Sequence, residues 1–328
     1  MTSKYLNVLN KNKGFYELDF SDFEEFIEFI RPDKSNAREL MSELKLRENP
    51  IYVESQLLGR IEITQTHILE KSIVYRGHGD SEWDLVPTFY RQPVNNGFIF
   101  TDKYIEHNKE KELLLKFQES CDLAGVQLPS DDDQLRRAQK TQLHSYFSKF
   151  GHGGWDWFTK EFFELAVFAQ HYTVPTRLLD WTKNPLVACY FASSYALSLN
   201  YQKEKKISIW VLNSSELTEE LEEILEVLDP PKGINQHISH QQGVLTYTRT
   251  HRNIFHKFGL RPKLQDLMEH YNCSYRLLKI NLSYDHVENL FNFCNFHNFN
   301  ACHLFRGAHG AATHTKDLVN YENFNYLE

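Results

Sequence analysis

The stretch QHYTVPTRLLDWTKNPLVACYFA, residues 170–192, decides the fold, because it joins a predicted strand to a predicted helix. "RLLDWT" reads as a short apolar strand that carries Arg177, Asp180 and Thr182. Asn184 is a suitable N-cap for the helix, and the proline after it suits the first helical turn. The free N–H groups of a helix start attract anions. The junction therefore predicts a small polar niche in an apolar wall, where Thr182 and Asn184 can contact a ligand.

The same residues also allow a purely structural interpretation. Asp180 would then only tie Arg177 and the backbone of Trp181 together, as happens at many strand–helix turns. His171, at the exit of the preceding predicted helix, either donates a hydrogen bond to a ligand carbonyl or is a satisfied core histidine.

A second polar segment, KSIVYRGHGD, occupies residues 71–80. Its apolar residues predict a strand that ends at Arg76, and the two glycines predict the turn after it. A guanidinium at such a strand end can hold a phosphate, and glycines let a ligand approach the backbone. The alternative is an ion pair between Arg76 and Asp80, Asp84 or Asp180.

Bulk composition limits the functional classes. The chain has 328 residues, a net charge of −8 and five widely spaced cysteines without a CxxC pair. The negative charge argues against general nucleic-acid binding. The cysteines indicate neither a disulfide framework nor a metal site, so we expect no metal and a cytoplasmic location. No apolar run is long enough to predict a membrane span.

The order of predicted elements is mixed, which indicates an α+β protein with a mixed or antiparallel sheet core. We expect a helical N-terminal extension over residues 1–70. The main domain then spans residues 71–328, with helical insertions near 101–150 and 214–230.

Four segments resemble the FRG domain family. They are YRGHGDSEWDLVPTFYR, AQHYTVPTRLLDWTKNPLVACYFA, QQGVL and NACHLFRGAHGAATHTKDL, and together they fall within residues 70–320. The chain departs from the family pattern at Thr173, where glycine is usual, and at Arg306, where proline is usual.

A weaker resemblance links the chain to ADP-ribosyltransferases of the arginine-serine-glutamate type. The matching elements are Tyr75-Arg76-Gly77 and Asp180-Trp181-Thr182, and the catalytic glutamate would fall near Gln241. This resemblance implies an ADP-ribosyltransferase-like sheet core and NAD, or a related nucleotide, as substrate or ligand. It also implies transfer of ADP-ribose to a macromolecular acceptor or hydrolysis of NAD, as in a toxin or anti-phage effector with an operon-encoded partner.

The resemblance assigns roles to individual residues. Arg76 would hold phosphate, Thr182 would contact ribose or phosphate, and Gln241 would contact the ligand. Asp180 is a candidate catalytic carboxylate, and the remaining candidates for the binding site are Tyr75, Gly77, His171, Arg177 and Asn184. Because Gln241 and the glutamine after it carry no charge, a non-catalytic ligand-sensing or interaction domain is the alternative.

Overall fold

The computed structural model describes most of the chain. The described residues are 3–55, 59–63, 72–91, 103–149, 156–199, 204–215, 217, 219–230, 240–249, 257–258 and 263–324. Within these ranges, no helix is both long and apolar enough to cross a membrane.

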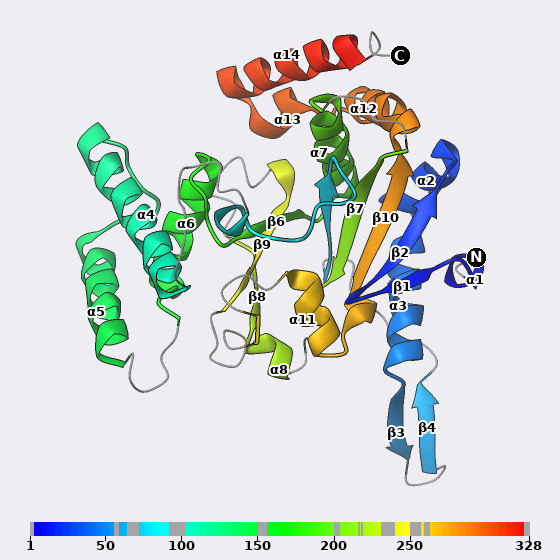
Figure 1. Ribbon diagram of the computed structural model, residues 1–328, viewed down its shortest axis with the longest axis horizontal. Helices are drawn as coiled ribbons and strands as arrows, with labels where there is room; N and C mark the ends of the chain where they lie inside the picture. Colours follow the sequence, from blue (N-terminus) through cyan, green and yellow to red (C-terminus); the bar gives the residue numbers. More distant parts are fainter. Residues whose placement is uncertain are drawn as a thin grey trace.

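A mixed eight-stranded sheet forms the centre of the protein, in the order β1-β2-β10-β7-β5-β6-β9-β8 (Figure 1). The pair β2–β10 is parallel and the other neighbours are antiparallel. The strands are β1 (Asn10–Asn12), β2 (Phe15–Phe20), β5 (Ile73–His78), β6 (Leu179–Thr182), β7 (Lys206–Asn213), β8 (Leu225–Leu228), β9 (Gly243–Thr248) and β10 (Leu277–Ser283). The prediction of an α+β protein with a mixed sheet is confirmed.

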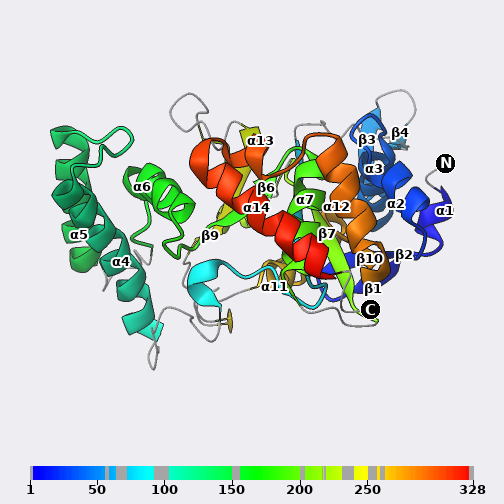
Figure 2. The same cartoon turned by 90° about the horizontal axis from the view of Figure 1, so that it is seen from above.

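Helix α7 (Pro185–Leu197) packs against β5 and β7 at the centre of the sheet. Ten of its thirteen residues are buried, because α12 (Val287–Phe296) and α14 (Gly307–Phe324) pack against it from outside. Helix α13 (Ala301–Phe305) lies beside α14 (Figure 2). The sheet, α7 and the outer helices α12 and α14 therefore form successive layers.

A separate helical group lies at the side of β9 (Figure 1). It consists of α4 (Lys103–Ala124), α5 (Asp133–Lys149) and α6 (Lys160–His171). Its own apolar cluster joins Leu114 and Phe162 to Leu178, Leu245 and Tyr247 at the sheet. The helices predicted near residues 101–150 are thus present, and α6 precedes β6 in the chain.

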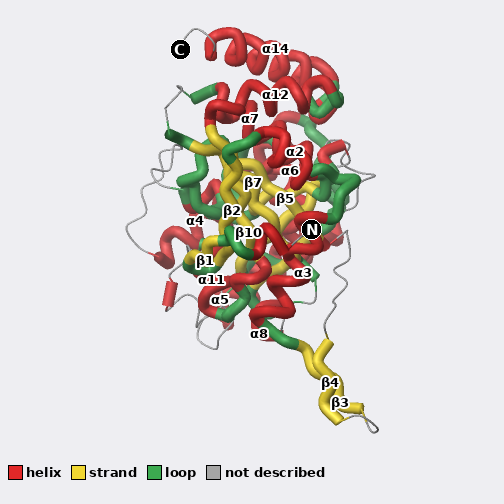
Figure 3. Tube along the Cα trace, turned by 90° about the vertical axis from the view of Figure 1, so that its right-hand side faces the viewer, coloured by secondary structure: helices red, strands yellow, loops and turns green. Residues whose placement is uncertain are grey.

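The helical N-terminal extension expected over residues 1–70 also contains strands. The helices α2 (Phe23–Ile30) and α3 (Asn36–Glu48) exist, and Asp22 caps α2 as its sequence indicates. However, β2 pairs with β10 in the main sheet, a partner that lies some 260 residues further along the chain. A short α1 (Ser3–Leu6) precedes these strands. A further hairpin of β3 (Ile51–Ser55) and β4 (Gly59–Ile63) projects from the body (Figure 3).

The helix predicted over residues 214–230 is wrong for most of its length. Among the described residues of this range, only Glu219–Glu222 (α8) are helical, and Leu225–Leu228 forms β8 instead. This segment extends the sheet by pairing with β9, which would otherwise expose an unpaired edge. The remaining short elements are η2 (Thr88–Tyr90), α11 (Leu264–His270), η3 (Ser274–Arg276) and η4 (Tyr284–His286).

Candidate functional site

A cleft of about 310 Å³ opens where β5, β6 and the start of β9 meet α6 and α7. Its polar lining consists of Arg76, Gln170, His171, Asp180, Thr182 and Gln241. Its apolar walls include Tyr75, Val167, Trp181, Val187, Phe191, Tyr195, Val244, Leu245 and Phe305. The size and the mixture of apolar walls with few polar groups are typical of a small-molecule site.

Arg76 provides the positive charge of the cleft. Its Nη1 donates to the backbone oxygen of Asp180 at 2.8 Å and lies 3.9 Å from the Asp180 carboxylate. Within the described part of the chain, its Nη2 has no hydrogen-bond partner. The carboxylates of Asp80 and Asp84 pair with Lys205 and Lys263 instead. Arg76 therefore keeps a free donor for a ligand.

His78 holds the guanidinium of Arg76 from behind. The Nε of Arg76 donates to His78 Nε2 at 3.0 Å, and His78 Nδ1 lies 3.2 Å from the carbonyl oxygen of Trp83. Because Nε2 accepts from a guanidinium, the ring of His78 is neutral. Burial, with the charge of Arg76 as the next cause, lowers the pKa of His78 well below its usual value. Arg76 and His78 are two residues apart on β5, so their side chains lie on the same face of the sheet. The sequence analysis did not use this spacing.

Asp180 supplies the carboxylate of the cleft, and 64 % of its side chain is exposed there. Gln170 Nε2 donates to its Oδ1, and Thr176 Oγ1 in turn donates to Gln170 Oε1. Water reaches much of its surface, but the surrounding cleft walls desolvate the carboxylate and raise the pKa of Asp180 above its usual value, while the charge of Arg76 opposes this effect. Gln170 orients the carboxylate, a role that the sequence did not reveal.

The hydroxyl of Thr182 is used within the protein. It donates to the backbone oxygen of Gln241 at 2.6 Å and accepts from the backbone N–H of Asn184 at 3.1 Å. The hydroxyl thus ties the start of β9 to the strand–helix junction. The side-chain amide of Gln241 makes no hydrogen bond to any other described residue, so it remains free for a ligand.

Asn184 is the N-cap of α7, as predicted, and its Oδ1 accepts from the backbone N–H of Leu186 at 3.0 Å. It does not line the cleft. The side chain of Asn184 therefore occupies the backbone N–H of Leu186, a donor that was expected to be free for an anion. The structure gives Asn184 the role of a helix cap, and Arg76 is the cationic side chain that lines the cleft.

Gly77 lies inside β5 rather than in a turn after it. A Cβ atom at this position would lie 2.0 Å from the backbone oxygen of Ala188 and 2.8 Å from the backbone nitrogen of Ala192. The glycine therefore lets α7 approach the strand closely, although its backbone also borders the cleft. The structure thus gives Gly77 a role in helix packing, and its contact with a ligand stays a prediction.

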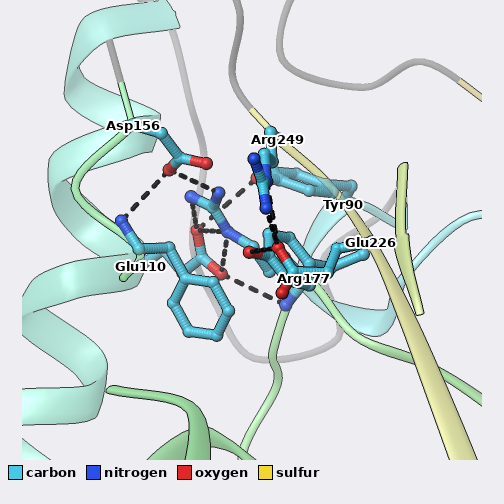
Figure 4. A network of polar contacts seen from close by, with 8 residues as sticks. Tyr90, Glu110, Asp156, Arg177, Glu226 and Arg249 are labelled. Carbon is cyan, nitrogen blue, oxygen red and sulfur yellow. Dashed lines mark hydrogen bonds and ion pairs between the residues drawn. The ribbon is translucent and has the colours of Figure 1, made fainter. Parts of the chain in front are cut away.

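Arg177 lies outside the cleft, in a buried ion-pair network (Figure 4). Its Nη2 lies 2.7 Å from Glu110 of α4, and its Nη1 lies 2.8 Å from Asp156. The side chains of Arg177 and Glu110 are 1 % and 0 % exposed. The structure thus favours the structural alternative for Arg177, whose contacts join the helical group to the start of β6.

The structure brings together most of the predicted site. Tyr75, Arg76, His171, Asp180 and Gln241 all border the cleft. Sequence analysis missed Gln170 and the aromatic wall formed by Phe191, Tyr195 and Phe305. Periodicity alone does not separate a core residue from one that faces a ligand, so the sequence pattern did not identify this wall.

The two departures from the family pattern both have positive φ angles. Thr173 has φ 64°, a conformation that glycine adopts at little cost, in the turn between α6 and β6. Arg306 has φ 52°, which proline cannot adopt because its ring fixes φ near −65°. The turn at Arg306 therefore differs from one built around proline.

Comparisons with known proteins agree with the sequence motifs. Neither a curated protein nor a solved structure matches the chain significantly. Residues 71–200, which contain β5, α6, β6 and α7, match the FRG domain. These elements carry Arg76, Gln170 and Asp180, so most of the polar lining lies in the matched region. The chain therefore contains an FRG domain.

Proposed function

We propose that the cleft binds NAD or a related nucleotide, and that the protein is an ADP-ribosyltransferase or an NAD glycohydrolase. The main support is one juxtaposition: Arg76, Asp180 and Gln241 come from three separate segments and border the same cleft. These segments belong to β5, β6 and the start of β9, which are neighbours in the sheet. They are the segments that the resemblance to ADP-ribosyltransferases requires together.

Arg76 is suited to hold phosphate. Its side chain is 14 % exposed, His78 fixes its orientation, and its Nη2 is free among the described residues. A guanidinium fixed in this way binds phosphate oxygens without a large loss of side-chain entropy. The apolar and aromatic walls on either side can contact a base or a ribose.

Asp180 is suited to the chemical step. In this mechanism the bond between ribose C1′ and the nicotinamide nitrogen breaks, and nicotinamide leaves as a neutral molecule with the bonding electrons. The ionised Asp180 stabilises the positive charge on the sugar. A water molecule or an acceptor group then attacks C1′ and gives its proton to Asp180. Asp180 is the one carboxylate among the residues that line the cleft.

A second candidate is nucleotide binding without turnover, as in a ligand sensor. The uncharged Gln241 and the Thr182 hydroxyl, which is bonded to the Gln241 backbone, favour this candidate. Neither group can stabilise a cation as a glutamate would. A macromolecular acceptor and an effector role in toxicity or anti-phage defence belong to the enzymatic proposal.

The test combines calorimetric binding of NAD with chromatographic detection of released nicotinamide. We expect Arg76→Gln to weaken NAD binding at least about 10-fold, and Asp180→Asn to lower turnover about 100- to 1,000-fold while binding is retained. Arg137→Gln, which changes an exposed arginine on α5, is the matched control and should change neither.

The outcomes separate the candidates. Saturable binding without nicotinamide release supports the sensor. Absence of NAD binding, or an Arg76→Gln protein that binds NAD as tightly as the wild type, refutes both.

A further inference from the structure

An exposed aromatic pair, Trp83 and Tyr195, adjoins the cleft and has no role in the site described above. Tyr195, on α7, lines the cleft itself, and its ring centre lies 6.2 Å from that of Trp83 at an interplanar angle of 81°. The ring of Trp83 in turn lies 6.0 Å from the ring of His78, whose Nε2 accepts from Arg76. These contacts place the pair at the rim of the cleft, one side chain away from the guanidinium of Arg76.

Both rings of the pair are free to contact a ligand. The exposed fractions are 38 % for Trp83 and 54 % for Tyr195, whereas Trp157, Trp181 and Trp210 are at most 3 % exposed. Within the described part of the chain, neither the indole N–H of Trp83 nor the hydroxyl of Tyr195 forms a hydrogen bond. Rings of this kind can stack on a planar group and can also bond to its polar edge.

The backbone holds both rings in fixed positions. Gly79 lets Tyr195 approach the end of β5, since a Cβ atom at Gly79 would lie 2.6 Å from Tyr195 Cβ. The turn that carries Trp83 is closed by a bond of 3.2 Å from its backbone N–H to the backbone oxygen of Asp80. The carboxylate of Asp80 also accepts from the backbone N–H of Glu82 at 2.9 Å. A pair fixed in this way loses little conformational entropy when a ligand binds.

The cleft is small for a whole dinucleotide. Its volume of about 310 Å³ lies at the lower end of the range of about 300–1,000 Å³ that is typical of ligand pockets. NAD contains two bases, two riboses and two phosphates, so part of it must lie on the rim of such a cleft.

The contacts of Arg76 indicate which part of NAD that is. Asp180, which the proposed function places at the nicotinamide ribose, contacts Nη1 of Arg76. The path to Trp83 instead begins at Nε of Arg76 and passes through the ring of His78. With phosphate on Arg76 and the nicotinamide ribose at Asp180, the adenosine is the part that remains for the aromatic pair.

We propose that Trp83 and Tyr195 form the subsite for the adenine base of the dinucleotide, which stacks on one ring and meets the other ring with its edge. This inference rests on the proposed function, because it states where the cleft holds the second base. It assigns both residues to binding, whereas Asp180 retains the chemical step.

The test measures calorimetric affinities for NAD, AMP, ribose 5-phosphate and nicotinamide mononucleotide. For the wild type we expect AMP to bind at least about 10-fold more tightly than ribose 5-phosphate, which lacks the base. Trp83→Ala and Tyr195→Ala should each weaken NAD and AMP binding about 5- to 150-fold, the usual effect of removing an aromatic ring from a stacked base. The two ligands without adenine should change less than about 3-fold. Trp83→Phe should keep most of the AMP affinity, because it keeps an aromatic face.

Acrylamide quenching of tryptophan fluorescence provides a second readout. Trp83 is the most exposed of the described tryptophans, so a base stacked on it should shield it from acrylamide. AMP should therefore decrease the quenching of the wild-type protein, and Trp83→Phe should lack this change.

Phe296→Ala is the matched control, because Phe296 on α12 is 84 % exposed and does not line the cleft. Its affinities should equal those of the wild type. Unchanged AMP affinity in Trp83→Ala and Tyr195→Ala overturns this inference, and so does an equal loss of nicotinamide mononucleotide binding. If Arg76→Gln still weakens NAD binding in that case, only the adenine assignment fails. If no nucleotide binds the wild-type protein, the proposed function fails as well.

Discussion

Replacing Arg177 with methionine is expected to remove about 3–5 kcal/mol from the free energy of unfolding. The variant leaves Glu110, which is 0 % exposed, without the guanidinium that lies 2.7 Å from its Oε2. It also removes the contact of 2.8 Å with Asp156. A buried charge without its partner has a large desolvation penalty, whereas methionine fills a similar volume and limits the loss of packing.

Urea unfolding, followed by tryptophan fluorescence, measures this change. Trp157 is a suitable reporter, because the ring centre lies 5.3 Å from the guanidinium carbon of Arg177. Arg136→Met is the matched control: Arg136 pairs with Asp122 and Asp131, but its side chain is 26 % exposed. A partly exposed pair of this kind contributes only about 0–1 kcal/mol.

A double variant provides a second check. The substitution Glu110→Gln removes the buried charge that Arg177→Met leaves without its partner, so it checks the cause of the loss. The double variant Arg177→Met/Glu110→Gln should recover part of the loss at neutral pH. A loss no larger than that of Arg136→Met would refute the assignment of a buried, stabilising network.

Three further predictions concern the cleft and its supports. Gly77→Ala should lower the free energy of unfolding by about 1–3 kcal/mol in urea titrations. The new Cβ would lie 2.0 Å from the backbone oxygen of Ala188, so α7 would have to move. A neutral effect would contradict the close packing of α7 on β5. Thr173→Gly should instead raise the free energy of unfolding by about 0.5–1 kcal/mol. The left-handed conformation at φ 64° costs a non-glycine residue about 1–2 kcal/mol, and the larger backbone entropy of glycine in the unfolded chain offsets part of the relief. Destabilisation would argue against strain at this residue. If the protein turns over NAD, kcat/KM should fall as the pH is lowered, with a midpoint above 3.8, the ordinary pKa of aspartate. The reason is that desolvation raises the pKa of Asp180 and that only its ionised form stabilises the sugar cation. Asp180→Asn should lack this acidic decrease, and a midpoint at or below 3.8 would contradict the role of Asp180 in the chemical step.

Local signals in the sequence were sufficient for the elements that build the cleft. The apolar run before Arg76 indicated β5, and the Asn-Pro pair indicated the start of α7, where Asn184 does cap the helix. These features depend on contacts between neighbouring residues, such as the bond from Leu186 N to Asn184 Oδ1. Sequence patterns describe contacts of this range well.

Features that depend on distant partners could not be predicted in the same way. The segment Leu225–Leu228 has an amphipathic helical pattern, yet it forms a strand because the edge of β9 is available for pairing. β2 likewise owes its position to β10. The burial of Arg177 depends on Glu110, which lies 67 residues away on α4. In each case the tertiary partner overrides or completes the local preference.

The hydrogen bonds of the cleft separate the groups that build it from those that can act on a ligand. Thr182 is bonded to the backbone at Gln241, and Asn184 caps α7, so neither offers its full capacity to a ligand. Arg76 keeps a free nitrogen among the described residues, and Asp180 keeps most of its side chain exposed in the cleft. In the proposed function, Arg76 would hold phosphate and Asp180 would stabilise the sugar cation. The absence of a carboxylate at Gln241 therefore shifts the question of catalysis to Asp180, whose substitution tests it directly.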